Sequence, residues 1–218
     1  MSMLMPNPEE FVRKDHTYFS KLRDRIGTKR LAELFNRVRE SLKQQGVIRE
    51  IFTFVDASKL ESRIDTWKAR DKAIADAENQ QRDDDDNPTM NNKNVEKYSS
   101  DSEARFGSKG KKDIWLGYKR HTSVDMRHGL INKVAITPAN VSDARGLKHI
   151  CPAQGAVLGC KSYCTNTAQQ EIKRRQCHSL AILKNNMKGK NREKDRFLTK
   201  LRMPYEGVFS SLQSTARY

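Results

Sequence analysis

Apolar residues recur at helical spacing in two stretches near the start of the chain. Residues 8–26 carry apolar side chains three and four positions apart, and residues 28–42 repeat the pattern. Pro8 before two acidic residues is typical of a helix start, and Gly27 and Gly46 end the two segments. We therefore expect two amphipathic helices, which either pack against the rest of the chain or belong to a helical DNA-binding region.

Strand-like patterns follow these helices. Residues 47–55 form a run of β-branched and aromatic side chains, which predicts a buried strand that ends on Asp56. Two alternating stretches around a His-Gly turn predict a hairpin, and two short apolar runs predict further strands. These four elements are expected at residues 117–125, 130–137, 156–159 and 179–183.

Helical segments alternate with the later strands. We expect short helices at residues 143–150 and 165–176, and a final helix that Pro204 opens and that carries Glu206. A hairpin followed by strand–helix–strand units predicts an α/β fold with a mixed sheet. Residues 61–97 are polar and include four consecutive aspartates, so they predict a flexible insertion that is helical in part.

Positive charge is concentrated in the second half of the chain. The formal net charge is +15, and residues 101–218 hold 23 basic but only nine acidic side chains. Residues 1–100 are nearly balanced, with 19 basic and 18 acidic side chains. A well-solvated surface would explain part of this excess, but such an asymmetry favours a polyanionic partner, above all nucleic acid.

Composition excludes several classes of protein. No run of about 18 apolar residues exists, which excludes a membrane span, and the first residues lack the pattern of a secretory signal. We expect a cytoplasmic protein whose four cysteines are free thiols. The spacings of the Cys and His residues do not match known zinc clusters; the nearest grouping is Cys160, Cys164, Cys177 and His178.

Two carboxylates, Asp56 and Glu206, are candidates for a catalytic or metal-binding role. Asp56 follows an apolar strand, where it either caps the next turn or is buried beside a metal ion or a cation. Glu206 lies in the first turn of a predicted helix, where a carboxylate also complements the helix dipole. From these residues alone, both alternatives stay open for each acid.

Five sequence motifs, which occur in a fixed order along the chain, relate these two acids to a known protein family. The chain resembles bacterial insertion-sequence transposases of the DDE group, in the branch that includes insertion sequence five. The resemblance runs from about Tyr18 to the C-terminus. It is carried by FVDAS around Asp56, KGKKDIWLGYKRH at 109–121, VAITPANVSD at 134–143, KNNMKGKN at 184–191 and RMPYEGVF at 202–209.

The resemblance implies a ribonuclease-H-like fold with a mixed sheet flanked by helices. It also implies three acids that bind Mg²⁺, or Mn²⁺, to cut and join transposon ends. Asp56 then corresponds to the first acid and Glu206 to the last. Cys160 occupies the position of the second acid, in a Cys-Lys-Ser-Tyr stretch where the family has Asp-Lys-Gly-Tyr. Because a thiol is a soft ligand and is neutral near pH 7, we expect impaired catalysis.

The resemblance also implies the partners and the domains. Double-stranded DNA and the inverted-repeat ends are the expected partners, in the nucleoid of a prokaryote, with a second copy of the chain as a further candidate. Residues 1–46 would be the remnant of a DNA-binding region, and residues 47–218 the transposase domain with its insertion. Both ends are shorter than in the family, which predicts a truncated copy. The candidate nucleic-acid contacts are Lys161, Lys184, Lys188, Lys190 and Arg202.

Two alternatives to an impaired transposase follow from the same residues. The chain could be a DNA-binding remnant without catalysis, which a salt-dependent gel shift without cleavage would favour. It could also be a translation product that does not fold, which aggregation or rapid proteolysis would indicate.

Overall fold

The computed structural model describes residues 16–62, 99–109 and 113–215, together with residues 68, 71, 72, 75 and 96. Most of the predicted insertion and the predicted helix start at Pro8 lie outside these residues. The internal contacts divide the chain into two units, residues 1–49 and residues 50–218. Within the described part of the chain, every helix is too short or too polar to cross a bilayer.

The first unit contains the two predicted amphipathic helices, α1 (His16–Ile26) and α2 (Thr28–Gln44). Gly27 separates them with a φ angle of 78°, a conformation that glycine adopts without strain. None of the residues of α2 is buried, and its apolar stripe stays exposed at Leu34, Phe35 and Val38. The helices were therefore predictable from periodicity, but the apolar stripe of α2 contributes no buried side chain among the residues that the structure describes.

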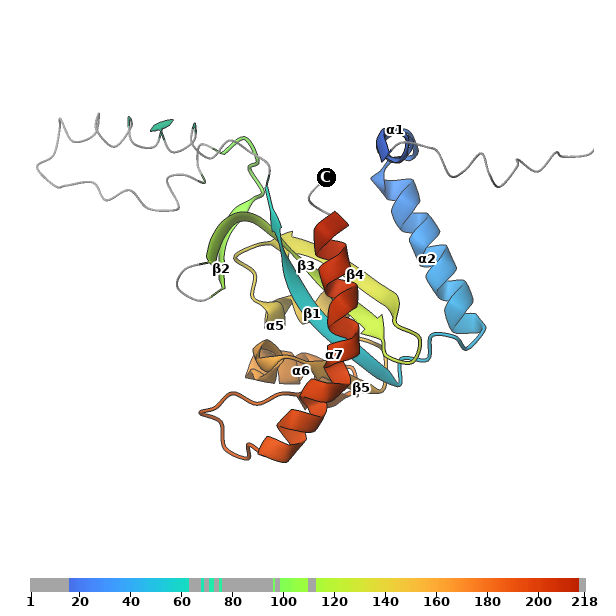
Figure 1. Cartoon of the computed structure of the whole chain (residues 1–218), viewed down its shortest axis with the longest axis vertical. Coiled ribbons are helices and arrows are strands. Elements are labelled where there is room, and N and C mark those ends of the chain that lie inside the picture. Colours follow the sequence, from blue (N-terminus) through green and yellow to red (C-terminus); the bar gives the residue numbers. More distant parts are fainter. Residues whose placement is uncertain are drawn as a thin grey trace, which may run out of the picture. The chain divides into compact units, whose positions relative to one another are not determined.

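A mixed sheet forms the centre of the second unit, as the sequence predicts. The central strand, β1, pairs antiparallel with β3 and parallel with β5, and β5 pairs parallel with β6. Two further strands, β2 and β4, pair antiparallel with different halves of β3 (Figure 1). The strands are β1 (Phe52–Glu61), β2 (Arg105–Lys109), β3 (Asp113–Asp125), β4 (Leu130–Pro138), β5 (Ala156–Gly159) and β6 (His178–Ala181).

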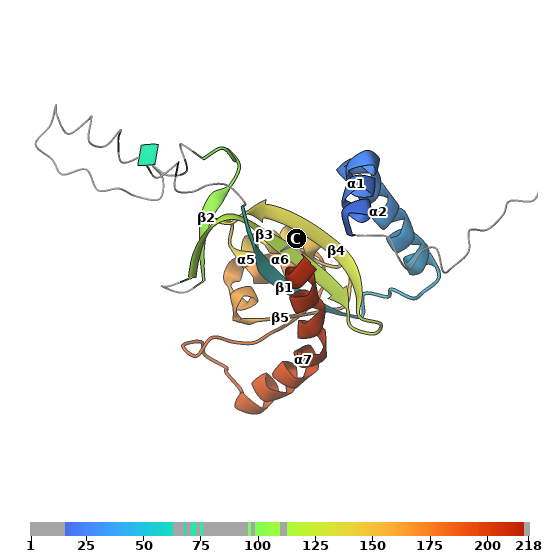
Figure 2. The same cartoon turned by 45° about the horizontal axis from the view of Figure 1, so that its top comes forward.

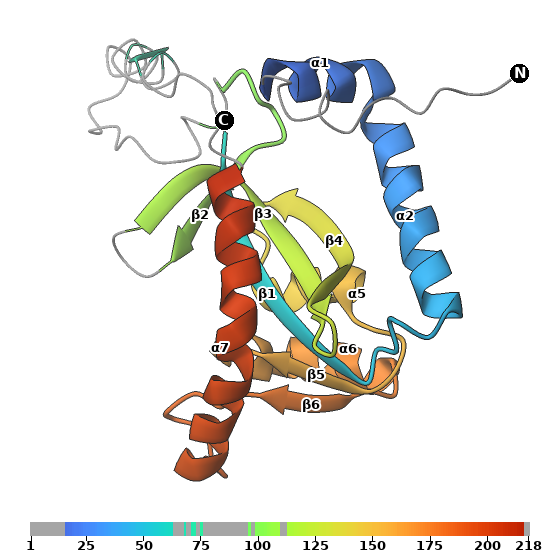
Figure 3. The same cartoon turned by 45° about the vertical axis from the view of Figure 1, so that its right-hand side comes forward.

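Helices cover both faces of this sheet. Two of them, α5 (Asp143–Ile150) and α6 (Asn166–Arg174), lie on one face, and α7 (Arg192–Thr215) crosses β1 on the other (Figures 2 and 3). A short 3₁₀ helix, η2 (Lys161–Cys164), joins β5 to α6.

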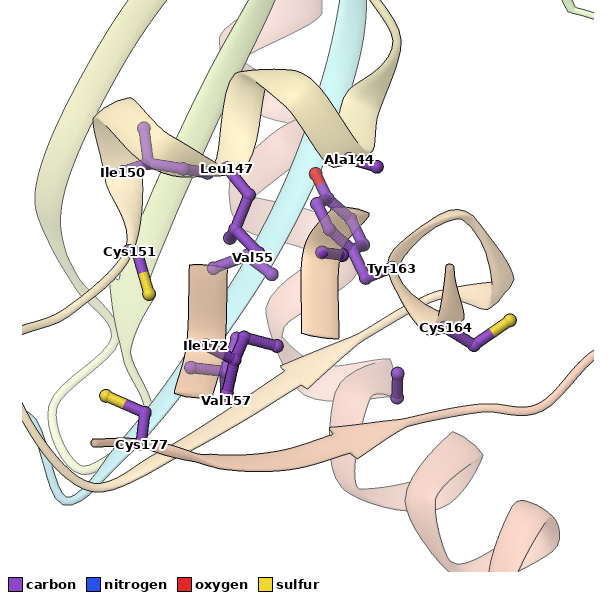
Figure 4. Close-up of a cluster of buried hydrophobic side chains, with 12 residues drawn as sticks. Val55, Ala144, Leu147, Ile150, Cys151, Val157, Tyr163, Cys164, Ile172 and Cys177 are labelled. Atoms are coloured by element: carbon purple, nitrogen blue, oxygen red, sulfur yellow. The ribbon is translucent and has the colours of Figure 1, made fainter. Parts of the chain in front are cut away.

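Alternation along the strands divides the core into two clusters. Val55 and Val157 pack with α5, η2 and α6 (Figure 4), whereas Phe54 and Leu158 face α7. This period of two follows from strand geometry, because successive side chains point to opposite faces. Asp56 directly follows Val55, so it belongs to the face that α7 covers.

Strand β1 starts and ends later than the sequence predicts. The expected strand covered residues 47–55, but the chain turns at Glu50, which has a φ angle of 54°. The buried carboxylate of Glu50 accepts hydrogen bonds from Asn132 Nδ2 at 2.6 Å and from the Ala153 amide at 3.0 Å. Pairing with β3 then continues as far as Glu61. Asp56 consequently lies within the strand and not at its end.

The helix that carries Glu206 also starts earlier than predicted. Asn191 Oδ1 accepts hydrogen bonds from the amides of Glu193 and Lys194, at 2.9 and 3.0 Å, so Asn191 caps the helix. Pro204 therefore lies inside α7 and does not open it. The prediction from Pro204 was wrong because the Asn cap and the acidic first turn thirteen residues upstream set the start.

The helix α5 packs closely on a buried histidine of β3. His121 is fully buried, its Nε2 lies 2.9 Å from Thr137 Oγ1, and burial lowers the pKa of the imidazole to about 4. Gly146 of α5 lies against this ring, because a Cβ at that position would be 2.2 Å from His121 Cε1. The glycine thus sets how closely α5, with Asp143 at its start, approaches the sheet.

We expect Gly146→Ala to lower the free energy of unfolding by about 1–3 kcal/mol, because overpacking of a buried ring outweighs the better helix propensity of Ala. Urea unfolding measures this change. Gly207→Ala is the matched control, since nothing lies within 4 Å of a Cβ at that position of α7. The control should be neutral or stabilising. Equal stability of the Gly146→Ala variant and the wild type would contradict the close packing.

Candidate active site

The parallel pairing of β1 with β5 brings Asp56 and Cys160 together. Val55 is the last residue of β1 in register with β5, where it pairs with Gly159. Asp56 follows Val55 on β1, and Cys160 follows Gly159 on β5. Both residues therefore lie where the parallel pairing of the two strands ends. The carboxyl ends of parallel strands are a common place for binding sites, and here β5 leaves the sheet while β1 continues along β3 to Glu61.

A cavity of about 500 Å³ opens at this position. Its lining includes Asp56 and Cys160, and also Asp143 from the first turn of α5. Ser142 caps that helix by accepting a hydrogen bond from the Arg145 amide at 3.3 Å. The Nζ atom of Lys119, on β3, lies 3.0 Å from Asp143 Oδ1, and both side chains are largely buried. The carboxylates of Asp56 and Asp143 and the thiol of Cys160 therefore meet in one cavity, which Asp113 also lines.

The environment of the cavity disfavours negative charge on Asp56 and Cys160. Burial raises the pKa of the Asp56 carboxyl, the nearby negative charge of Asp143 raises it further, and the positive charge of Arg202 opposes the shift. Burial also raises the pKa of the Cys160 thiol, although its Sγ accepts a hydrogen bond from the Ser162 amide at 3.4 Å. The sulfur is therefore protonated at neutral pH.

Arg202 connects the cavity to Glu206. The guanidinium lines the cavity near Asp56 and lies 5.9 Å from the ring centroid of Phe54. Its Nε and Nη2 atoms donate hydrogen bonds of 3.0 and 2.7 Å to the same oxygen of Glu206, one helical turn further along α7. Tyr205 fixes this part of α7, because its hydroxyl donates a hydrogen bond to the Met126 carbonyl. Glu206 itself is about half exposed and does not line the cavity.

The remaining predicted DNA contacts are not among the residues that line the cavity. Lys161, Lys184 and Lys188 are exposed at the surface. Lys190 is half-buried, with its ammonium donating to Asn185 and lying 3.8 Å from Asp195. Of the five predicted basic contacts, only Arg202 lines the cavity.

Three lysines of the cavity were not among the predicted site residues. Lys59 lies 2.9 Å from Asp113, Lys119 pairs with Asp143, and Lys109 stands at the end of β2. Lys59 and Lys119 approach the ring of Trp115 from 5.9 and 6.0 Å. Lys119 lies in the GYKRH stretch that carries the resemblance, so its motif was visible in the sequence, but its ion pair with Asp143 was not.

The donors present do not fit a pair of divalent ions. Mg²⁺ prefers several charged oxygen ligands, whereas the second position of the expected set is a protonated thiol. Asp143 is bound to Lys119, and Glu206 is bound to Arg202. Among the described residues, no three His, Cys, Asp or Glu side chains are grouped as metal ligands.

A family model described as "Transposase DDE domain" matches residues 90–217, more than half of the chain. The match covers Cys160, Arg202 and Glu206 but begins downstream of Asp56. No curated protein and no solved structure matches the chain significantly.

We expect Asp56→Asn to stabilise the protein at pH 7. The folded state raises the pKa of Asp56 above its ordinary value of 3.8, so the ionised carboxylate destabilises the fold at any pH above the folded pKa. The advantage of the amide should therefore be absent below the ordinary value of 3.8, grow as the pH rises from there to the folded pKa, and stay constant at higher pH. Urea unfolding at several pH values measures both.

Asp143→Asn is the control for this experiment. It breaks a largely buried ion pair with Lys119 and should lower the free energy of unfolding by at least about 1 kcal/mol at pH 7. A loss of stability on Asp56→Asn at pH 7 would show that Asp56 is a structural group.

Proposed function

We propose that this chain, which belongs to the family of transposase DDE domains, is a transposase-type DNA-binding protein with impaired metal-dependent strand cleavage and transfer. The observation that carries the proposal is the position of Cys160 beside Asp56, at the end of the parallel strand pair. We further assign the sheet to the ribonuclease-H-like fold and the chain to the branch that includes insertion sequence five.

Transposase DDE domains generally use divalent metal ions. Such ions neutralise the charge of the phosphodiester and stabilise the attacking and leaving oxygens, which is how strands are cut and joined. In our proposal Asp56 and Glu206 occupy the positions of the first and last acids, with Mg²⁺ as the ion and Mn²⁺ as its substitute. Cys160 occupies the position of the second acid.

Charge and hydrogen bonding support the impairment. The thiol of Cys160 has a raised pKa, so it offers a neutral sulfur where the site needs a charged oxygen. Asp143 lines the same cavity, but a lysine 3.0 Å away neutralises it. Glu206 is likewise bound by Arg202. A divalent ion would have to compete with both cations for these carboxylates.

The partner that we propose is double-stranded DNA, with the inverted-repeat ends of a transposon as its specific form. The 23 basic side chains of residues 101–218 provide the electrostatic attraction. We assign direct phosphate contacts to the basic residues predicted from the sequence, and a supporting role in DNA binding to the helices of residues 1–46. The contacts are Lys161, Lys184, Lys188, Lys190 and Arg202.

A DNA-binding role without any catalysis is the second candidate function. The ion pairs of Asp143 and Glu206 favour it, because they occupy the carboxylates that could otherwise hold a metal ion. The two candidates differ in whether any strand cleavage occurs in Mg²⁺ or Mn²⁺.

We expect the chain to bind duplex DNA with an affinity that falls steeply as the salt concentration rises. Lys188→Ala should reduce the slope of log K against log [salt] by about one, because one phosphate contact is lost. Fluorescence anisotropy with a labelled duplex measures this slope. Lys148→Ala removes an equally exposed lysine from α5 and should leave the slope unchanged. A salt-independent affinity would contradict the proposed DNA binding.

Restoring the missing acid should restore metal binding. We expect Cys160→Asp to bind Mn²⁺ more tightly than the wild type, because it adds a charged oxygen ligand beside Asp56. Calorimetric titration with Mn²⁺ measures this gain, and Cys160→Ser, which adds a neutral oxygen, is the matched control. Efficient cleavage of DNA by the wild-type chain in Mg²⁺ would contradict the proposed impairment.

A further inference from the structure

The cavity beside Asp56 carries more positive than negative side chains. Its three carboxylates belong to strands and to the start of α5, whereas its cations come from three strands and from α7. The carboxylates are Asp56, Asp113 and Asp143, and the cations are Lys59, Lys109, Lys119 and Arg202. Counted at their formal charges, the lining has an excess of one positive charge before anything binds.

Ion pairs within the lining already neutralise most of its negative charge. Lys119 pairs with Asp143 at 3.0 Å, and Lys59 pairs with Asp113 at 2.9 Å. The positive charge of Arg202 acts on Asp56, which burial already biases toward its neutral form. A divalent cation that entered the cavity would therefore meet repulsion from these cations and few available carboxylate oxygens.

The lining of the cavity also contains groups that can bind an anion. Lys109 is exposed at the end of β2 and, although its positive charge acts on Asp56, it forms no ion pair with any of the described residues. The hydroxyl-bearing residues Ser108 and Ser162 also line the cavity and can donate hydrogen bonds. Arg202 has further N–H donors besides the two that bind Glu206. A volume of about 500 Å³ accommodates a phosphate group with part of its nucleotide.

We propose that this cavity binds one phosphodiester group of DNA directly on its lysine and arginine side chains, without a bridging divalent ion. The proposal rests on the proposed DNA binding and goes beyond it by naming the site of one phosphate and the groups that hold it. The excess of cationic side chains makes the cavity unsuitable for two metal ions. The same excess favours the binding of an anion.

Cys160 provides a probe of this cavity. It is the half-buried cysteine and lines the cavity, whereas Cys151, Cys164 and Cys177 are buried elsewhere. The experiment measures the rate at which iodoacetamide alkylates Cys160 in the full chain at mildly alkaline pH, by mass spectrometry of the modified peptide. The rate is determined with and without a short DNA oligonucleotide, in EDTA and in Mg²⁺ at matched ionic strength.

We expect the oligonucleotide to slow alkylation of Cys160 several-fold, and equally in EDTA and in Mg²⁺. An oligonucleotide of the same sequence with neutral methylphosphonate linkages should give no protection. Lys109→Ala should weaken the protection, whereas Lys148→Ala, an exposed lysine outside the cavity, should not. Urea unfolding of both variants shows that they fold.

The outcomes separate this inference from the proposed function. DNA binding measured by anisotropy without protection of Cys160 would overturn the inference and leave the proposed function intact. Protection that requires Mg²⁺ would overturn it as well, and so would equal protection by inorganic phosphate, which would assign the cavity to a small anion. Absence of any DNA binding would overturn both proposals.

Discussion

The parallel register of β1 and β5 is the constraint on which the candidate site depends. Because Val55 pairs with Gly159, the residues that follow them, about a hundred positions apart in sequence, become neighbours. The alternation of side chains then directs Phe54 to α7 and Val55 to α5, so that the two helices pack against the same strand from opposite faces. A shift of register by one residue would move Asp56 to the opposite face of the sheet.

Two carboxylates of the cavity, Asp113 and Asp143, are neutralised by side chains of the same protein. Carboxylates that share a small volume normally need an external cation, because their mutual repulsion raises the pKa of at least one of them. Here the chain supplies its own cations, from β1, β3 and α7. Each ion pair holds one carboxylate in place, as a metal ion would otherwise do. Each pair also occupies oxygen atoms that a metal ion would need.

Local patterns predicted most of the elements, although they missed β2 and the first four residues of β3, and they did not predict how the elements pack together. The bounds of α5 and β5 agree with their apolar patterns, because both are short segments closed by clear turn and cap residues. The start of β1 depends on the buried hydrogen bonds of Glu50, whose partners lie about 80 and 100 residues away. Likewise, Asp143 could not be placed in the cavity from sequence, because tertiary packing of α5 on His121 brings it there.

The pairing of Arg202 with Glu206 means that another anion can release the carboxylate by competing for the guanidinium. Two N–H donors converge on one carboxylate oxygen, and only a rival anion of similar geometry offers the arginine an equivalent arrangement. A phosphate has that geometry, so in the proposed complex a phosphate of the DNA backbone that bound Arg202 would release the Glu206 carboxylate.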